Sequence, residues 1–131
     1  MLINALPPQQ WTLFLAAGSS ADVTFTFTTT DPGGTTPYPI SGDTWEYVVR
    51  ETAGSSGGPL ISVTTSASAA GLITVTATSA VSQALLALYP AATATLGAGS
   101  YSHAFWQNPG NPTTAFCWML GTLTVTGAAQ P

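Results

Sequence analysis

Residues 22–28 read Asp-Val-Thr-Phe-Thr-Phe-Thr, and in this stretch apolar side chains alternate one for one with threonine. Successive side chains of a strand point to opposite faces, so Val23, Phe25 and Phe27 share one face and the threonines share the other. Threonine is β-branched, which favours strands, and its hydroxyl group tolerates water without a charge. The stretch therefore predicts an antiparallel strand with one face in the core and one face in water.

The same alternation returns at residues 73–78 and 122–126, and further strands are predicted at 10–16, 44–51, 60–64, 100–107 and 115–121. Turn-forming residues separate these segments, among them Asp31-Pro-Gly-Gly34 and Asn108-Pro-Gly-Asn-Pro112. Seven or eight short strands with such punctuation predict an all-β fold, an immunoglobulin-like antiparallel β-sandwich, with a barrel as the alternative.

Two segments depart from this rhythm. Residues 79–89 carry Val81, Leu85 and Leu88 at helical spacing after a possible N-cap at Ser79, which predicts one short helix between the sheets. Gly121 interrupts the last run of alternating apolar residues, with Phe116, Trp118 and Leu120 before it and Leu123 and Val125 after it. A β-bulge is expected there, which would change the face that points inward.

Charge is scarce along the whole chain. Arg50 is the single basic residue besides His103, five acids give a net charge of −4, and only 5 % of residues are charged, against about 25 % in an ordinary soluble domain. A surface with so little charge favours contact with other copies or other proteins; the alternative is a monomer solvated by neutral polar side chains. One basic side chain cannot neutralise several phosphates, so neither a nucleic acid nor an anionic membrane is an expected partner.

The length of 131 residues suits a single domain. We divide it into an N-terminal arm, residues 1–11, and one sandwich domain, residues 12–131. No window supplies the roughly 18 continuous apolar residues of a spanning helix. The N-terminus lacks the basic segment and the long apolar run of a signal peptide.

A search for catalytic chemistry finds little. His103 is the single histidine, which predicts a structural role and excludes a site with several imidazoles. Cys117 is the single cysteine and is expected to be a buried, inert thiol. Asp43 and Glu46 form a close carboxylate pair, but Asp43 lies in a Ser-Gly-Asp turn, where an Asx-type hydrogen bond explains it without catalysis. Glu46 and Arg50 are expected on the same strand face, with Val48 between them. Gly54-Ser-Ser-Gly-Gly58 matches the nucleophile-elbow pattern without a following helix. We therefore predict no enzyme activity, no cofactor and no metal.

Large aromatic side chains are the remaining functional candidates. Tryptophan occurs at positions 11, 45, 106 and 118. At strand positions such rings usually fill the ~10 Å gap between two sheets or anchor a subunit interface. The alternative is a row of exposed rings that stacks on sugars, as in a carbohydrate-binding or adhesin module.

The order of these signals resembles a small β-sandwich domain of tailed-bacteriophage virion proteins, found in baseplate, minor tail and capsid accessory proteins. The residues that carry the resemblance are Asp22 with its alternating strand, Asp31-Pro-Gly-Gly34, Tyr38-Pro-Ile-Ser-Gly-Asp-Thr-Trp45, Gly71-Leu-Ile-Thr-Val75, Gly99-Ser-Tyr101 and Gly121-Thr-Leu-Thr-Val125.

This resemblance implies a non-enzymatic structural protein of the virion, made in the host cytoplasm. The expected role is a capsid decoration or cement protein that binds the capsid exterior in many copies, with a minor tail or baseplate protein as the alternative. Its partners would be the major capsid protein or tail proteins, and other copies of itself. The residues predicted to form interfaces are Leu2, Ile3, Leu6, Trp11 and Trp106.

Overall fold

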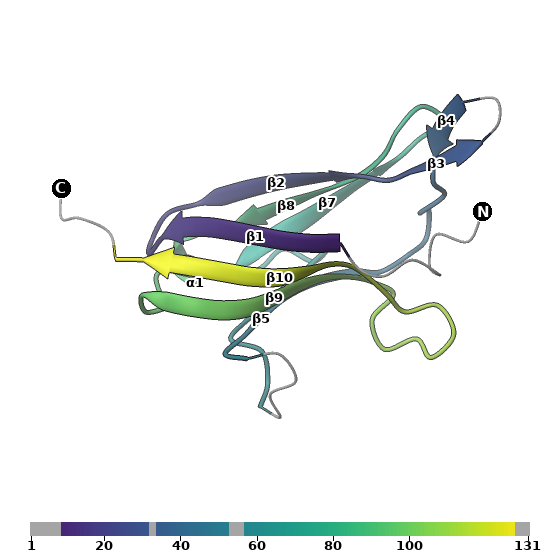
Figure 1. Ribbon diagram of the computed structural model, residues 1–131. Coiled ribbons are helices and arrows are strands. Elements are labelled where there is room, and N and C mark those ends of the chain that lie inside the picture. The colour runs from purple at the N-terminus through teal and green to yellow at the C-terminus, as the bar shows by residue number, and fades with distance from the viewer. Residues whose placement is uncertain (1–8, 32–33, 53–56, 128–131) are drawn as a thin grey trace.

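Ten strands and one short helix make up the part of the chain that the computed structural model describes, residues 9–31, 34–52 and 57–127 (Figure 1). The strands are β1 (Gln9–Ala16), β2 (Ala21–Thr26), β3 (Thr28–Asp31), β4 (Gly34–Pro37), β5 (Trp45–Arg50), β6 (Ile61–Thr64), β7 (Gly71–Ala77), β8 (Ser82–Leu88), β9 (Gly99–Gln107) and β10 (Phe116–Thr126), and the helix is α1 (Pro90–Thr93).

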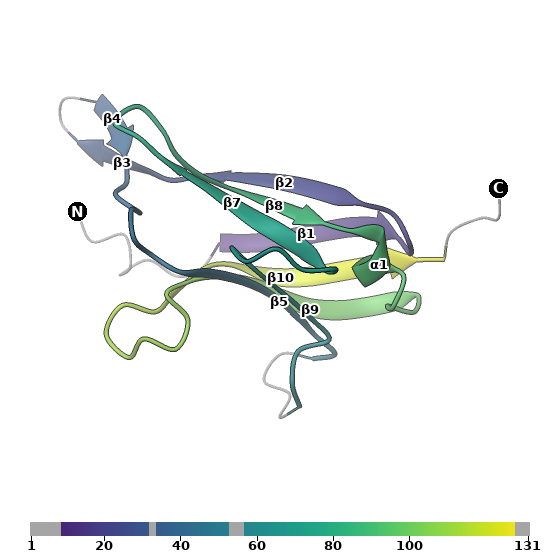
Figure 2. The ribbon, with the colours of Figure 1, turned by 180° about the vertical axis from the view of Figure 1, so that it is seen from behind.

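Two sheets pack face to face, which confirms the predicted all-β sandwich. The larger sheet has the strand order β1-β10-β9-β5-β6, and the smaller one has the order β2-β8-β7. A separate hairpin, β3–β4, extends from one end of the sandwich in both views (Figures 1 and 2). Neighbouring strands are antiparallel with one exception, since β1 runs parallel to β10 over its whole length. The purely antiparallel pairing that we predicted is therefore wrong for this pair.

The strand order is that of an immunoglobulin-like sandwich. In that nomenclature β5, β9 and β10 take the places of strands C, F and G, and β2, β8 and β7 take those of B, E and D. Tyr101, near the start of β9, donates its hydroxyl hydrogen to the carbonyl oxygen of Gly97 at 2.7 Å, which is the tyrosine-corner contact of such folds. Trp45 of β5 is buried between the sheets, as a strand-C tryptophan is expected to be.

The core lies between the two sheets and follows the period-two pattern of the strands. Each large apolar side chain that is fully buried there stabilises the fold by about 1.5–3 kcal/mol. The buried side chains include Leu15, Phe25, Phe27, Ile40, Trp45, Tyr47, Val49, Ile61, Val63, Ile73, Leu86, Leu88, Phe105, Leu123 and Val125.

The helix predicted for residues 79–89 is wrong. Residues 82–88 form β8, the central strand of the smaller sheet, and Ser82, Ala84, Leu86 and Leu88 point into the core with a period of two. Alanine and leucine favour helices, but β8 pairs with β2 on one side and β7 on the other, and this pairing outweighs intrinsic propensity. The one helix among the described residues, α1, follows directly after this strand.

The change of face in β10 occurs earlier than predicted. The pairing of β10 with β9 is irregular between Cys117 and Met119, whereas Gly121 lies in regular register opposite His103. Gly121 serves a different purpose, because a Cβ atom there would lie 1.9 Å from the carbonyl oxygen of Trp11. Only glycine lets β1 approach β10 this closely.

Candidate functional site

His103, the one histidine, is buried in the core and fully hydrogen-bonded. Its Nε2 lies 2.7 Å from the carbonyl oxygen of Trp11, and its Nδ1 lies 3.0 Å from the hydroxyl oxygen of Tyr47. A carbonyl oxygen can only accept, so Nε2 carries the proton and Nδ1 accepts from Tyr47. The Trp11 ring stacks on the imidazole at a centroid distance of 4.1 Å. Both nitrogens are thus occupied within the protein, and His103 joins three strands of the larger sheet.

Burial shifts the pKa values of His103 and Tyr47 away from neutral pH. It lowers the pKa of His103, with the hydrogen bond to Trp11 opposing the shift, and it raises the pKa of Tyr47. The imidazole is therefore neutral at physiological pH, and the phenol keeps its proton.

Asp43 and Glu46 have separate partners. The Asp43 carboxylate accepts hydrogen bonds from the side-chain amides of Gln107 at 2.5 Å and Asn108 at 3.1 Å, which ties the turn before β5 to the end of β9. This long-range contact replaces the local Asx-type bond that the sequence suggested. Glu46 instead accepts from the Ser62 hydroxyl at 2.6 Å, on the far side of β5 from the core. The two carboxylates do not share a hydrogen-bond partner.

Cys117 is half-buried, and burial is the largest influence on its thiol. It raises the pKa of Cys117, while hydrogen bonds to backbone groups, including the carbonyl oxygen of Met119 at 3.3 Å, oppose the shift. A thiol with a raised pKa is a poor nucleophile. The glycine-serine segment with the nucleophile-elbow pattern falls partly outside the described residues.

One surface stands out once these interior groups are accounted for. The side chains of the larger sheet that point away from the core form what we call the outer face, and among the described residues no strand or helix packs over it. Its members are Gln10, Thr12 and Phe14 of β1, Leu120, Thr122 and Thr124 of β10, Ser102, Ala104 and Trp106 of β9, Glu46, Val48 and Arg50 of β5, and Ser62 and Thr64 of β6.

Apolar side chains run across the middle of the outer face. The strand register places Leu120 of β10 beside Ala104 of β9, and Ala104 beside Val48 of β5. Trp106 lies one row further along β9, next to Glu46. Phe14 is 70 % exposed and Leu120 is 37 % exposed, so the face offers unburied apolar surface.

Two shallow depressions lie on either side of Trp106. One is lined by Val48, Arg50, Ser102, Ala104 and Leu120, and the other by Glu46, Val48, Arg50 and the loop residues Pro109 and Gly110. Arg50 donates to the carbonyl oxygen of Gly57 at 2.6 Å. Within the described part of the chain, neither Arg50 nor Glu46 has an oppositely charged partner. Arg50 thus lies on this face and, counting only partners among the described residues, keeps guanidinium donors for a further partner.

The tryptophans divide between the two sides of this sheet. Trp45 is buried, and Trp11 and Trp118 are partly buried with their rings packed against the core. Trp11 belongs to β1, so the boundary placed at residue 11 falls inside a strand of the sandwich. Trp106 is the only tryptophan on the outer face. The other residues predicted to form interfaces, Leu2, Ile3 and Leu6, lie outside the described residues.

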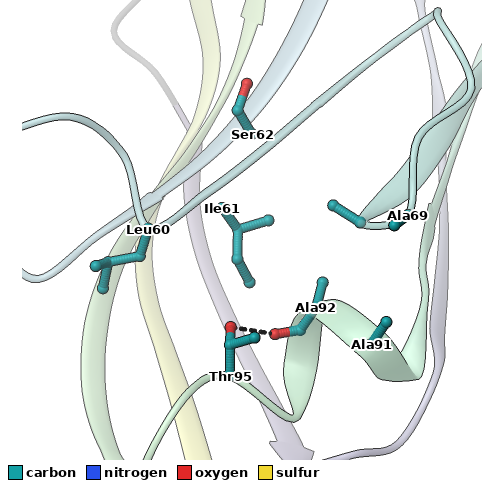
Figure 3. Close-up of a pocket in the computed structure, with 8 residues that line it drawn as sticks. Leu60, Ile61, Ser62, Ala69, Ala91, Ala92 and Thr95 are labelled. Carbon is teal, nitrogen blue, oxygen red and sulfur yellow. Dashed lines mark hydrogen bonds between the residues drawn. The ribbon is translucent and has the colours of Figure 1, made fainter.

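A third hollow lies at the β6 edge of the larger sheet (Figure 3). Leu60, Ile61 and Ser62 line it from the start of β6, Ala69 from the connection to β7, and Ala91, Ala92 and Thr95 from α1 and the residues after it. The hydroxyl group of Thr95 donates a hydrogen bond to the carbonyl oxygen of Ala92 at 2.6 Å. Its described lining residues include no titratable group.

Sequence reasoning found part of the outer face. Alternation along β5 placed Glu46, Val48 and Arg50 together, as the structure does. It missed Leu120, which was grouped with Trp118, because the irregularity at 117–119 was not expected at that place. It also missed Phe14, although the inward alternation of Trp11, Leu13 and Leu15 in β1 was available as a signal.

No protein-family model matches the sequence, and no curated protein matches it. No cluster of three or more histidine, cysteine or acidic residues suited to a metal ion occurs in residues 9–31, 34–52 and 57–127. Over the same ranges, no helix has the length and apolar character needed to cross a membrane.

Proposed function

We propose that this chain is a non-enzymatic structural protein that works by binding other protein surfaces. The observation that carries the proposal is the outer face, a sheet surface with apolar side chains at its centre, neutral polar residues around them and two charged groups. Such a face binds by burial of apolar area without the cost of desolvating many charges. The hydrogen bonds of His103, Asp43 and Cys117 support the same interpretation, because each group is engaged inside the fold.

The specific setting that we propose is the virion of a tailed bacteriophage, where the chain decorates the capsid exterior in many copies. The sequence resemblance described above supports this setting. Binding to the major capsid protein would stabilise the particle by mass action, since anything that binds the assembled state favours it. Attachment through tail proteins, as a minor tail or baseplate component, is the alternative location.

The number of copies per particle tests this proposal. Quantitative mass spectrometry of purified virions from a phage that carries the gene should give hundreds of copies for a decoration protein. A few to several tens of copies would move the protein to the tail or baseplate. Absence from the particles would overturn the virion proposal.

The N-terminal arm is the segment that we propose docks on the capsid, through Leu2 and Ile3. The double variant Leu2→Asp with Ile3→Asp should remove the protein from particles while its thermal unfolding stays unchanged. The matched control is Thr24→Asp with Thr74→Asp, two exposed threonines on the surface of the smaller sheet, which should leave the copy number unchanged. Full decoration by the arm variant would contradict docking through the arm.

One observation favours a second candidate function, carbohydrate binding. Trp106 is half-exposed, and the depressions beside it bring Glu46 and Arg50 close to its ring. An aromatic ring flanked by charged hydrogen-bonding groups is a suitable platform for a sugar. Titration with a panel of glycans should then shift tryptophan fluorescence in the native protein and not in Trp106→Ala. No shift with any glycan would remove this candidate.

A further inference from the structure

The two charged side chains of the outer face are arranged symmetrically about one residue. Glu46 and Arg50 both point outward from β5, and Val48 lies midway between them. Strand residues four apart are separated by roughly 13 Å. Glu46 accepts a hydrogen bond from Ser62, and Arg50 donates one to Gly57. Each charge therefore lacks an ionic partner within the described chain, and the spacing keeps the two from pairing with each other.

A second copy of the same face supplies both missing partners at once. A two-fold axis that lies between two facing sheets, parallel to them and perpendicular to β5, and that passes over Val48 reverses the direction of β5 in the second copy. Arg50 of each copy then lies opposite Glu46 of the other, and the two apolar centres meet between these ion pairs. An interface built from one patch on both subunits must be self-complementary in this way.

We propose that the outer face binds a second copy of this chain in an isologous dimer, with reciprocal Arg50–Glu46 ion pairs on either side of Val48. This inference deepens the proposed function, because it rests on the same face and names the chain itself as the partner. In this arrangement the outer face contacts another copy of the chain, and the N-terminal arm remains available to bind the capsid.

The side chains at the centre of the face suit such a contact. Val48 and Ala104 are small and already nearly buried, at 9 % and 6 % exposed, whereas Trp106 and Leu120 beside them keep exposed surface that a partner could cover. Tryptophan and arginine are the residue types that most often dominate interface energies. Sheets that pack face to face lie about 10 Å apart at an angle near −30°, a separation that long side chains such as arginine and glutamate are suited to bridge.

The size of the face predicts a weak dimer. Five strands at a spacing of about 4.8 Å, each about six residues long, cover on the order of 500 Å² in projection. A standard stable interface buries about 800 Å² per partner. The loop between β9 and β10 extends away from the smaller sheet in both views (Figures 1 and 2) and adds to the contact through Pro109 and Gly110. We therefore expect dimers to form at high micromolar concentrations of the protein and not at low micromolar ones.

Charge reversal tests the proposal through sedimentation velocity of the full chain over about a hundredfold range of concentration. Arg50→Glu places two acidic groups opposite each other at both ends of the interface, and Glu46→Arg places two basic groups there. Each single variant should lose at least about tenfold in association constant, because like charges in an interface are strongly unfavourable. Thermal unfolding should match the native protein, which separates loss of association from loss of the fold.

Restoration gives the decisive result. An equimolar mixture of Arg50→Glu and Glu46→Arg should form heterodimers, because every charge then faces its opposite. The double variant Arg50→Glu with Glu46→Arg should regain homodimers for the same reason. The control variants Thr74→Arg and Thr74→Glu, on the surface of the smaller sheet, should dimerise like the native protein.

A native protein that stays monomeric at every concentration would overturn the inference, and so would single variants that dimerise normally or fail to recover on mixing. These outcomes are separate from the fate of the virion proposal. A monomer present in hundreds of copies per particle would refute the dimer alone, whereas a dimer absent from particles would refute the virion role alone.

Discussion

At the scale of single residues, the indole nitrogen of Trp45 is the clearest imperfection of the core. Trp45 is 2 % exposed, and its Nε1–H has no hydrogen-bond partner among the residues that the structure describes. Its ring packs against Phe27 and Phe105 at centroid distances of 4.9 and 5.5 Å. A buried donor without a partner costs about 1–3 kcal/mol. The packing of the large indole ring in the core offsets this cost.

Trp45→Phe should therefore cost less than a core tryptophan replacement usually does. The variant loses packing volume but removes the unpaired donor, and we expect a decrease of less than about 1.5 kcal/mol in the free energy of unfolding. The matched variant is Trp118→Phe. Its Nε1–H donates to the side-chain oxygen of Gln107 at 2.9 Å, and loss of that donor leaves a buried acceptor unpaired at about 1–3 kcal/mol. Urea unfolding of both variants tests the order, and a larger loss for Trp45→Phe would contradict it.

At the scale of strands, the attachment of β1 depends on the missing side chain of Gly121. Gly121→Ala would force its Cβ to within 1.9 Å of the Trp11 carbonyl oxygen, the same atom that accepts from His103. We expect a loss of about 3 kcal/mol, the upper part of the usual range for overpacking. Gly58→Ala is the control, since no atom of the described residues lies within 4 Å of the added Cβ. Equal thermal unfolding midpoints for the two variants would contradict this expectation and would show that β1 can move away from β10 at little energetic cost.

The identity of β8 as a strand leads to a second test at this scale. Leu86 is fully buried, whereas its neighbour Leu85 points outward and is half-buried. Leu86→Ala should cost about 2–5 kcal/mol and Leu85→Ala less than about 1 kcal/mol. A helix with Val81, Leu85 and Leu88 on its buried face would give the reverse order. Chemical denaturation of the two variants distinguishes these arrangements.

How far the sequence predicts each element depends on whether its pattern is local. The alternation of residues 22–28 and 122–126 is a local property, and the structure has strands there, with residues 22–26 in β2 and residues 122–126 in β10. Residues 82–88 form a strand because of partners distant in sequence, and the parallel pairing of β1 with β10 joins the two ends of the chain. Neither pairing leaves a local signal. The outer face was predicted where alternation is regular, at Glu46 and Arg50, and missed where an irregularity shifts the phase, at Leu120.

At the scale of the whole molecule, the hydrogen bonds of His103 connect stability to pH. The ring links β9 to β1 through Trp11 and to β5 through Tyr47, so its protonation state bears on the larger sheet as a unit. Among the described residues its hydrogen-bond partners, Tyr47 and the Trp11 backbone, are uncharged, and burial lowers its pKa below the ordinary value of 6.5. Below pH 6.5 the unfolded chain therefore binds a proton that the folded protein does not.

It follows that the free energy of unfolding rises with pH between the lowered pKa of His103 and about 6.5 and is level above that window. Acidification through the window should lower the midpoint of urea unfolding, before most carboxylates titrate near pH 4. His103→Gln, which does not titrate, should be less stable at neutral pH because Tyr47 loses its acceptor, and its stability should not vary across the same window. A native midpoint that stays constant between about pH 7 and 5 would mean that the pKa of His103 is the same in the folded and the unfolded protein. That result would contradict a buried imidazole that is kept neutral by the fold.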